Sequence, residues 1–149
     1  MLSNFLILED QIFFSYSLGN PVNIQLRYSS QLTIDSPTYY RDFEIPKCRF
    51  QTLEIKITTK GEYVLWSESD FDTYGYIYKN DFNALKPSEN LLLKHDGYCN
   101  GGQFKLFIDL EVNTRYVLVV TTHRPNTIGN FSVFISSLNN LTLNHISKY

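Results

Sequence analysis

The sequence contains almost no alanine, and none of its windows repeats apolar residues at helical spacing. Ala84 is the only alanine among 149 residues, whereas tyrosine and phenylalanine each occur eleven times. Alanine is the best helix former, and aromatic residues favour strands. The composition therefore argues against a helical protein. A hydrophobic content of 43% likewise argues against a disordered chain and is enough for one buried core.

The chain also lacks an excess of basic residues and any long apolar run. Lysine and arginine number 13 against 15 acidic residues, which gives a net charge of -2 with no basic patch. Nucleic acid is therefore not an expected partner. No apolar run approaches the length of a membrane-spanning helix. The first residues are briefly apolar, but Glu9 and Asp10 follow too soon for a signal peptide.

Sequence motifs of catalysis are missing as well. The chain has no Gly-x-Ser-x-Gly elbow, no His-Glu-x-x-His and no phosphate-binding loop. His95 and Asp96 are adjacent, so in a strand they would point to opposite faces and make a poor catalytic pair. We therefore predict that the protein is not an enzyme.

Alternating apolar and polar residues are the dominant pattern. Leu53, Ile55 and Ile57 alternate with polar residues, and Lys60-Gly61 follows them as a hairpin turn. Residues 116–120 form a continuous apolar run, which predicts a strand buried on both faces. Seven or eight such strands at roughly ten-residue spacing predict an all-β fold, an antiparallel β-sandwich of jelly-roll type.

The pattern predicts one domain with two flanking segments. Residues 29–137 are expected to form the sandwich, and residues 138–149 a polar C-terminal tail. Residues 1–28 are expected to be either an extra strand or the end of a preceding repeat. The sequence leaves those two alternatives open.

Strand direction predicts which loops share one end of the sandwich. If every connection after residue 50 reverses the chain, alternate loops meet at the same end. That end would gather the following polar residues: Asp42, Glu44, Cys48, Asp70, Asp72, His95, Asp96, Cys99 and His123.

Three of these carboxylates form a candidate calcium site. Ca²⁺ takes six to eight oxygen ligands, and Asp70, Asp72 and Asp96 could supply them if their loops meet. The alternative is that Asp70 and Asp72 only hydrogen-bond the backbone of a turn, a common use of aspartate.

The two cysteines, Cys48 and Cys99, are candidates for one disulfide. Closing a loop of about fifty residues would stabilise the fold by roughly 4 kcal/mol. The alternative is a pair of buried thiols. The glycosylation sequons Asn130-Phe131-Ser132 and Asn140-Leu141-Thr142 fit an extracellular setting.

Three aromatic residues form a candidate ligand-binding platform. Trp66 is expected on the outer face, beside a strand that carries Tyr74 and Tyr76. Aromatic faces offer large, rigid contact area to sugars or proteins. The alternative is that Trp66 and the tyrosines cover each other across neighbouring strands.

Several motifs occur together in one order. They are Gly61, Asp72-x-Tyr74-x-Tyr76-Ile77-Tyr78, Leu91-Leu92-Leu93 ending at Asp96 before Gly101-Gly102, and residues 114–120. On these residues the segment from Gly61 to about Ser137 resembles the bacterial pre-peptidase C-terminal domain, a relative of collagenase collagen-binding domains. Residues 38–42 extend the likeness to the repeats of large extracellular animal proteins. Gly97 stands where the family usually has a second acid.

The resemblance implies a non-catalytic extracellular module that binds a protein or glycan beside neighbouring domains of a longer chain. It also implies secretion and, for some members, bound calcium. A carbohydrate-binding module that uses Trp66, Tyr74 and Tyr76 is the first alternative. A purely structural repeat unit is the second.

Overall fold

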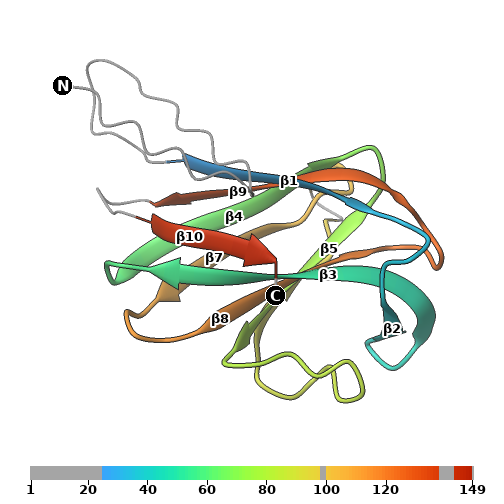
Figure 1. Ribbon diagram of the computed structural model, residues 1–149, viewed down its shortest axis with the longest axis horizontal. Helices are drawn as coiled ribbons and strands as arrows, with labels where there is room; N and C mark the ends of the chain where they lie inside the picture. The colour runs from blue at the N-terminus through green and yellow to red at the C-terminus, as the bar shows by residue number, and fades with distance from the viewer. Residues whose placement is uncertain (1–24, 98–99, 138–142, 149) are drawn as a thin grey trace.

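The computed structural model describes residues 25–97, 100–137 and 143–148, and these residues form ten strands and no helix (Figure 1). No helix in this part of the chain is therefore long and apolar enough to cross a membrane. The strands are β1 (Gln25–Leu32), β2 (Thr38–Arg41), β3 (Ile45–Ile57), β4 (Gly61–Ser69), β5 (Thr73–Lys79), β6 (Leu91–His95), β7 (Lys105–Leu110), β8 (Tyr116–Thr122), β9 (Gly129–Ser137) and β10 (Leu143–Lys148).

The strands make two antiparallel sheets that pack face to face (Figure 1). The first sheet has the order β1-β9-β4-β7. The second has the order β10-β3-β8-β5-β6, and β2 adds to it by pairing with β3. The predicted antiparallel β-sandwich is confirmed. The structure has more strands than predicted because the short β2 and the polar β10 lack a clear apolar alternation.

The main core lies between the sheets. Alternate residues of the paired strands point into it, so Leu65 of β4 and Leu118 of β8 are both fully buried. Gly75 of β5 lies against Phe104, which is also fully buried. A Cβ atom at position 75 would meet the Phe104 ring at 2.6 Å, so glycine lets the ring pack against the strand.

A second apolar cluster covers the outer face of the six-stranded sheet. Its buried members are Tyr39, Cys48, Phe50, Tyr76, Tyr78, Val117 and Val119. The β2 strand and the loop after β5 lie over them, with Phe82 of that loop packed against the cluster. Consequently all seven residues of β8 are buried, as the apolar run at 116–120 predicts.

The β2–β3 hairpin stands apart from the regular sheet. β3 starts at Ile45, but its pairing with β8 starts only at Phe50. Pro46, which has no N–H to donate, therefore lies in the part of β3 that pairs with β2 alone. This arrangement lets the hairpin fold over the outer face of the sheet.

Both ends of the described sandwich extend past the predicted boundaries. Leu26 and Tyr28 of β1 belong to the main core, and β1 pairs with β9 from Gln25 onward. Residues 143–148, predicted as tail, form β10 and pair with β3. The rest of the predicted flanking segments, residues 1–24, 138–142 and 149, lies outside the described residues.

Candidate functional site

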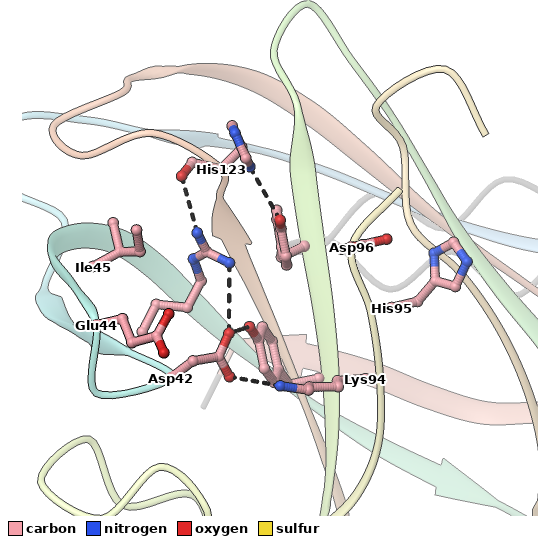
Figure 2. Close-up of a pocket in the computed structure, with 10 residues that line it drawn as sticks. Asp42, Glu44, Ile45, Lys94, His95, Asp96 and His123 are labelled. Carbon is pink, nitrogen blue, oxygen red and sulfur yellow. Dashed lines mark hydrogen bonds and ion pairs between the residues drawn. The ribbon is translucent and has the colours of Figure 1, made fainter. Parts of the chain in front are cut away.

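A hollow of about 490 Å³ lies beside the β2–β3 hairpin, and we call it the hairpin hollow (Figure 2). It is formed by the hairpin, by β5, by the end of β6 and by the residue after β8. Its lining residues are Arg41, Asp42, Glu44, Ile45, Tyr74, Tyr76, Lys94, His95, Asp96 and His123. Charges of both signs and aromatic rings therefore meet in one place.

Asp42 is the centre of the polar network in this hollow. Its Oδ1 atom lies 2.9 Å from Lys94 Nζ, and its Oδ2 atom accepts a 2.8 Å hydrogen bond from the Tyr76 hydroxyl (Figure 2). Arg41 Nη1 lies 3.6 Å from the same Oδ2 atom. Burial, and then the hydrogen bond to Asp42, raise the pKa of Tyr76 above its usual range. Tyr76 therefore stays protonated and donates to the carboxylate at neutral pH.

Arg41 ties the hairpin to the strand opposite. The residue is only 4% exposed, and its Nη2 atom donates a 3.1 Å hydrogen bond to the backbone carbonyl of His123. Its guanidinium carbon lies 3.9 Å from the centre of the Tyr74 ring, a cation–π contact. A buried charge is tolerated because it has these partners.

Three aromatic rings form a row, two from β5 and one from the residue after β8. His123 and Tyr74 stack with their centres 5.5 Å apart, and Tyr74 and Tyr76 stack at 6.4 Å. The Tyr74 hydroxyl lies 3.1 Å from His123 Nδ1. Tyr76 is only 2% exposed, so its ring cannot stack on a ligand. Tyr74 is half-buried, and His123 is exposed.

The tip of the hairpin has an unusual backbone. Asp42 and Phe43 have φ angles of 53° and 61°, and Glu44 N donates a 3.1 Å hydrogen bond to Arg41 O. Two successive left-handed residues are typical of a type I′ hairpin turn. Asparagine, aspartate and glycine are usual in such a turn, whereas a phenylalanine is strained there. Phe43 is 59% exposed, so the burial of its ring contributes little that could offset the strain.

The three predicted calcium ligands are not brought together. Asp96 lines the hairpin hollow, whereas Asp72 lines a second hollow with His123 and Arg124. Asp70 lines a third hollow over β1, β4 and β9. In the described parts of the chain, no three histidine, cysteine, aspartate or glutamate side chains could hold one metal ion.

The turn at residues 70–72 is fixed by the loop before β7. Gln103 Nε2 donates to the backbone carbonyls of Ser69 and Phe71, at 3.3 and 3.0 Å. The side chain of Asp72 lies so close to Gly102 that a Cβ atom there would collide with it. These contacts direct the Asp72 carboxylate toward Gly102 and hold the turn in place.

Cys48 is a free cysteine that is fully buried in the second apolar cluster. The structure places this thiol in the core, and the disulfide with Cys99 remains a prediction. Its predicted partner, Cys99, lies outside the described residues.

Trp66 does not share a platform with the tyrosines. It lies on the outer face of the four-stranded sheet and stacks on Phe134, with ring centres 5.2 Å apart. Tyr74 and Tyr76 lie on the outer face of the other sheet. The predicted common platform is therefore two separate features, and the tyrosines do not shield Trp66.

Strand parity identified half of the hairpin hollow. It placed Asp42, Glu44, His95, Asp96 and His123 at one end, and all five line the hollow. It missed two further lining residues that carry positive charge, Arg41 and Lys94.

Cross-strand register could have found one of the missed residues. Lys94 lies directly opposite Tyr76 in the β5–β6 ladder, so its side chain is on the same face. With these residues the hollow offers donors, acceptors and both signs of charge to a polar ligand. No protein-family model matches this sequence, and no curated protein matches it either.

Proposed function

We propose that the protein is a non-catalytic binding module that uses the hairpin hollow to hold a polar ligand. The observation that carries the proposal is the hollow itself, a concave space of about 490 Å³ with convergent polar groups beside half-buried Tyr74. Concave sites with a few placed polar groups are the usual form of ligand sites.

The fixed geometry of the hollow supports binding. Asp42 is held by Lys94, Tyr76 and Arg41, so its carboxylate does not need to reorganise when a ligand arrives. Most of the lining residues lie on strands or next to them. Such preorganisation lowers the entropic cost of association.

The charge balance of the hollow points to a ligand without strong charge. The lining carries two cations, Arg41 and Lys94, and three carboxylates, of which Asp42 pairs with both cations, so the net charge of the hollow is small. The other two carboxylates, Glu44 and Asp96, add hydrogen-bond acceptors to the lining. The ligand class that we propose is an extracellular protein segment or a glycan, with the module acting as an accessory to neighbouring domains.

A printed array of extracellular-matrix proteins and glycans tests this proposal. The wild-type chain is expected to bind at least one printed class, and Glu44→Gln and His123→Ala are expected to weaken that binding. Glu89→Gln is the matched control, because Glu89 is exposed in the loop after β5 and does not line the hollow. Silence of the wild-type protein, or equal binding by all four proteins, would refute a role for the hollow.

A carbohydrate-binding role of the opposite sheet is the second candidate. Trp66 is partly exposed and lies in register between Phe134 and Lys105, which gives a flat aromatic surface next to a cation. Sugars stack on such surfaces. On the same array, glycan binding that Trp66→Ala abolishes and Glu44→Gln leaves intact would select this candidate.

Calcium stabilisation and a purely structural repeat are separate predictions. Among the described residues no three such side chains could hold one ion, so a calcium would take fewer than all of Asp70, Asp72 and Asp96. Melting temperatures with and without millimolar calcium test the first prediction, and an unchanged value removes it. Similar domains flanking this one in the full-length gene would favour the repeat.

A further inference from the structure

A glycosylation sequon lies near the start of β9, away from the hairpin hollow. The sequon is Asn130-Phe131-Ser132, and its asparagine is exposed whereas the two following residues are buried. Asn130 pairs with Gln31 of β1 and is on the same face of the strand as Ser132 and Phe134. Its side chain therefore points away from the core, on the outer face of the four-stranded sheet.

The third hollow, which lies over β1, β4 and β9, includes Asn130 in its lining, and we call it the serine-lined hollow. It has a volume of about 600 Å³. Its lining residues are Arg27, Ser29, Ser30, Glu68, Ser69, Asp70, Asn130, Phe131 and Ser132. Four of these residues are serines; the Ser29 and Ser132 hydroxyls lie 2.9 Å from each other, and the Ser30 hydroxyl donates to Gln51 Oε1. Hydroxyl groups of this kind are suited to hydrogen-bond the hydroxyl and acetamido groups of a sugar.

We propose that Asn130 is an N-glycosylation site and that its first sugar lies over the serine-lined hollow. In the transfer, the side-chain nitrogen of Asn130 bonds to the anomeric carbon of the sugar. The donor is an oligosaccharide linked to a lipid pyrophosphate. The bond between that carbon and the pyrophosphate oxygen breaks, the lipid pyrophosphate leaves with the electron pair, and the amide loses one proton.

The folded structure is compatible with a sequon in this place. Ser132 is only 7% exposed. Its hydroxyl oxygen lies 2.9 Å from the Ser29 hydroxyl and 3.2 Å from Arg27 Nη2. Sugar transfer reads the sequon on the growing chain, before these contacts form. The folded protein must only leave the asparagine in solvent, and Asn130 meets that condition.

The glycan and the hairpin hollow would occupy opposite outer faces of the sandwich. The serine-lined hollow is built on β1, β4 and β9, whereas the hairpin hollow lies on the six-stranded sheet. The glycan would therefore leave the hairpin hollow open. The inference rests on the extracellular setting proposed above and not on ligand binding, so the array and the experiment below can fail independently.

The test is secretion of the full 149-residue chain from animal cells behind a secretory leader. Intact mass and peptide mapping follow, before and after release with a peptide N-glycosidase. We expect Asn130 to carry a glycan in the wild-type protein and to be deamidated after release. Asn130→Gln is expected to lose that glycan and Ser132→Thr, which keeps the sequon, is expected to retain it. Asn140→Gln controls for the other sequon.

A secreted wild-type protein whose Asn130 is unmodified would overturn the inference, even if Asn140 is occupied. Wild-type peptide mapping decides this point without any variant, so a variant that fails to fold leaves the test intact. The place of the first sugar has its own readout. The chain trimmed to one sugar should melt a few degrees above the fully released chain, and equal melting temperatures would contradict contact with the serine-lined hollow.

Discussion

The two outer faces of the sandwich differ in what covers them. The six-stranded sheet carries a second apolar cluster under the β2–β3 hairpin, with Tyr78 and Cys48 fully buried. The four-stranded sheet carries a row of directly paired residues across its outer face: Arg27, Phe134, Trp66 and Lys105. Only the first face has the depth to exclude water, so stability and the fixed geometry of the hairpin hollow should depend on it far more than on the second.

The largest expected loss of stability follows from removing a buried ring on the outer face of the six-stranded sheet, which we call the covered face. Tyr78 is fully buried, and its hydroxyl donates a 2.7 Å hydrogen bond to Pro87 O. Tyr78→Ala should lower the free energy of unfolding by about 3–5 kcal/mol. Trp66→Ala on the other face should cost less, about 2 kcal/mol, because the partly exposed ring loses some buried area and its stack on Phe134. Urea unfolding measures both losses, and equal values would contradict the expected difference between the two faces.

High pH should act on the covered face first. Burial raises the pKa of Tyr39, Tyr76 and Tyr78 above the usual value of about 10. Their neutral form is favoured by folding, so stability is intact below pH 10 and is lost as the pH rises above it. Urea midpoints between pH 8 and pH 11 measure this loss. Tyr78→Phe should show a shallower decline, and a decline of the same slope would argue against titration of Tyr78.

A smaller loss of stability is expected from a change at Asp42, the centre of the polar network in the hairpin hollow. Asp42→Asn removes the charge that Lys94 and the Tyr76 hydroxyl contact, and hydrogen bonds to charged groups are worth about 1.5–3 kcal/mol. Because the Asp42 side chain is 31% exposed, we expect a loss of about 1–2 kcal/mol. Lys86→Gln is the control, since its 4.0 Å pair with Glu89 is exposed. Thermal unfolding of the two variants should differ clearly.

The smallest expected effect is a gain in stability at the tip of the hairpin. Phe43→Asn should relieve the left-handed strain and stabilise the fold by about 0.5–1 kcal/mol, since asparagine tolerates a φ of 61°. Tyr40→Asn is the matched control, because Tyr40 is 57% exposed but has no left-handed backbone. The melting temperature should rise for Phe43→Asn and not for Tyr40→Asn. A fall for Phe43→Asn would mean that the exposed ring makes a stabilising contact.

Strand alternation predicted most strands of the two sheets but not the segments that cover them. The alternation at residues 53–57 predicted β3, because one face of that strand lies in the main core. Alternation says which face of a strand is apolar, not which segment folds over the opposite face. The β2–β3 hairpin covers its sheet through Tyr39 and Cys48, and a short segment of mixed polarity gives no periodic signal of that.

Parity predicted a shared end but could not separate sites within it. Asp42 and Asp96 both line the hairpin hollow, whereas Asp70 lines a hollow on the other sheet. One end of a sandwich carries loops from both sheets, and the sheets are about 10 Å apart. Loops that share an end are therefore not necessarily within ligand distance, and the calcium prediction assumed that they were.

The contact between Gly75 and Phe104 has a consequence for how this sequence can vary. The ring lies where any side chain on residue 75 would stand, and Phe104 is fully enclosed by the core. Neither residue can change alone, because a larger residue 75 displaces the ring and a smaller residue 104 leaves a void. The two positions should therefore covary, so that related chains change both residues together or neither.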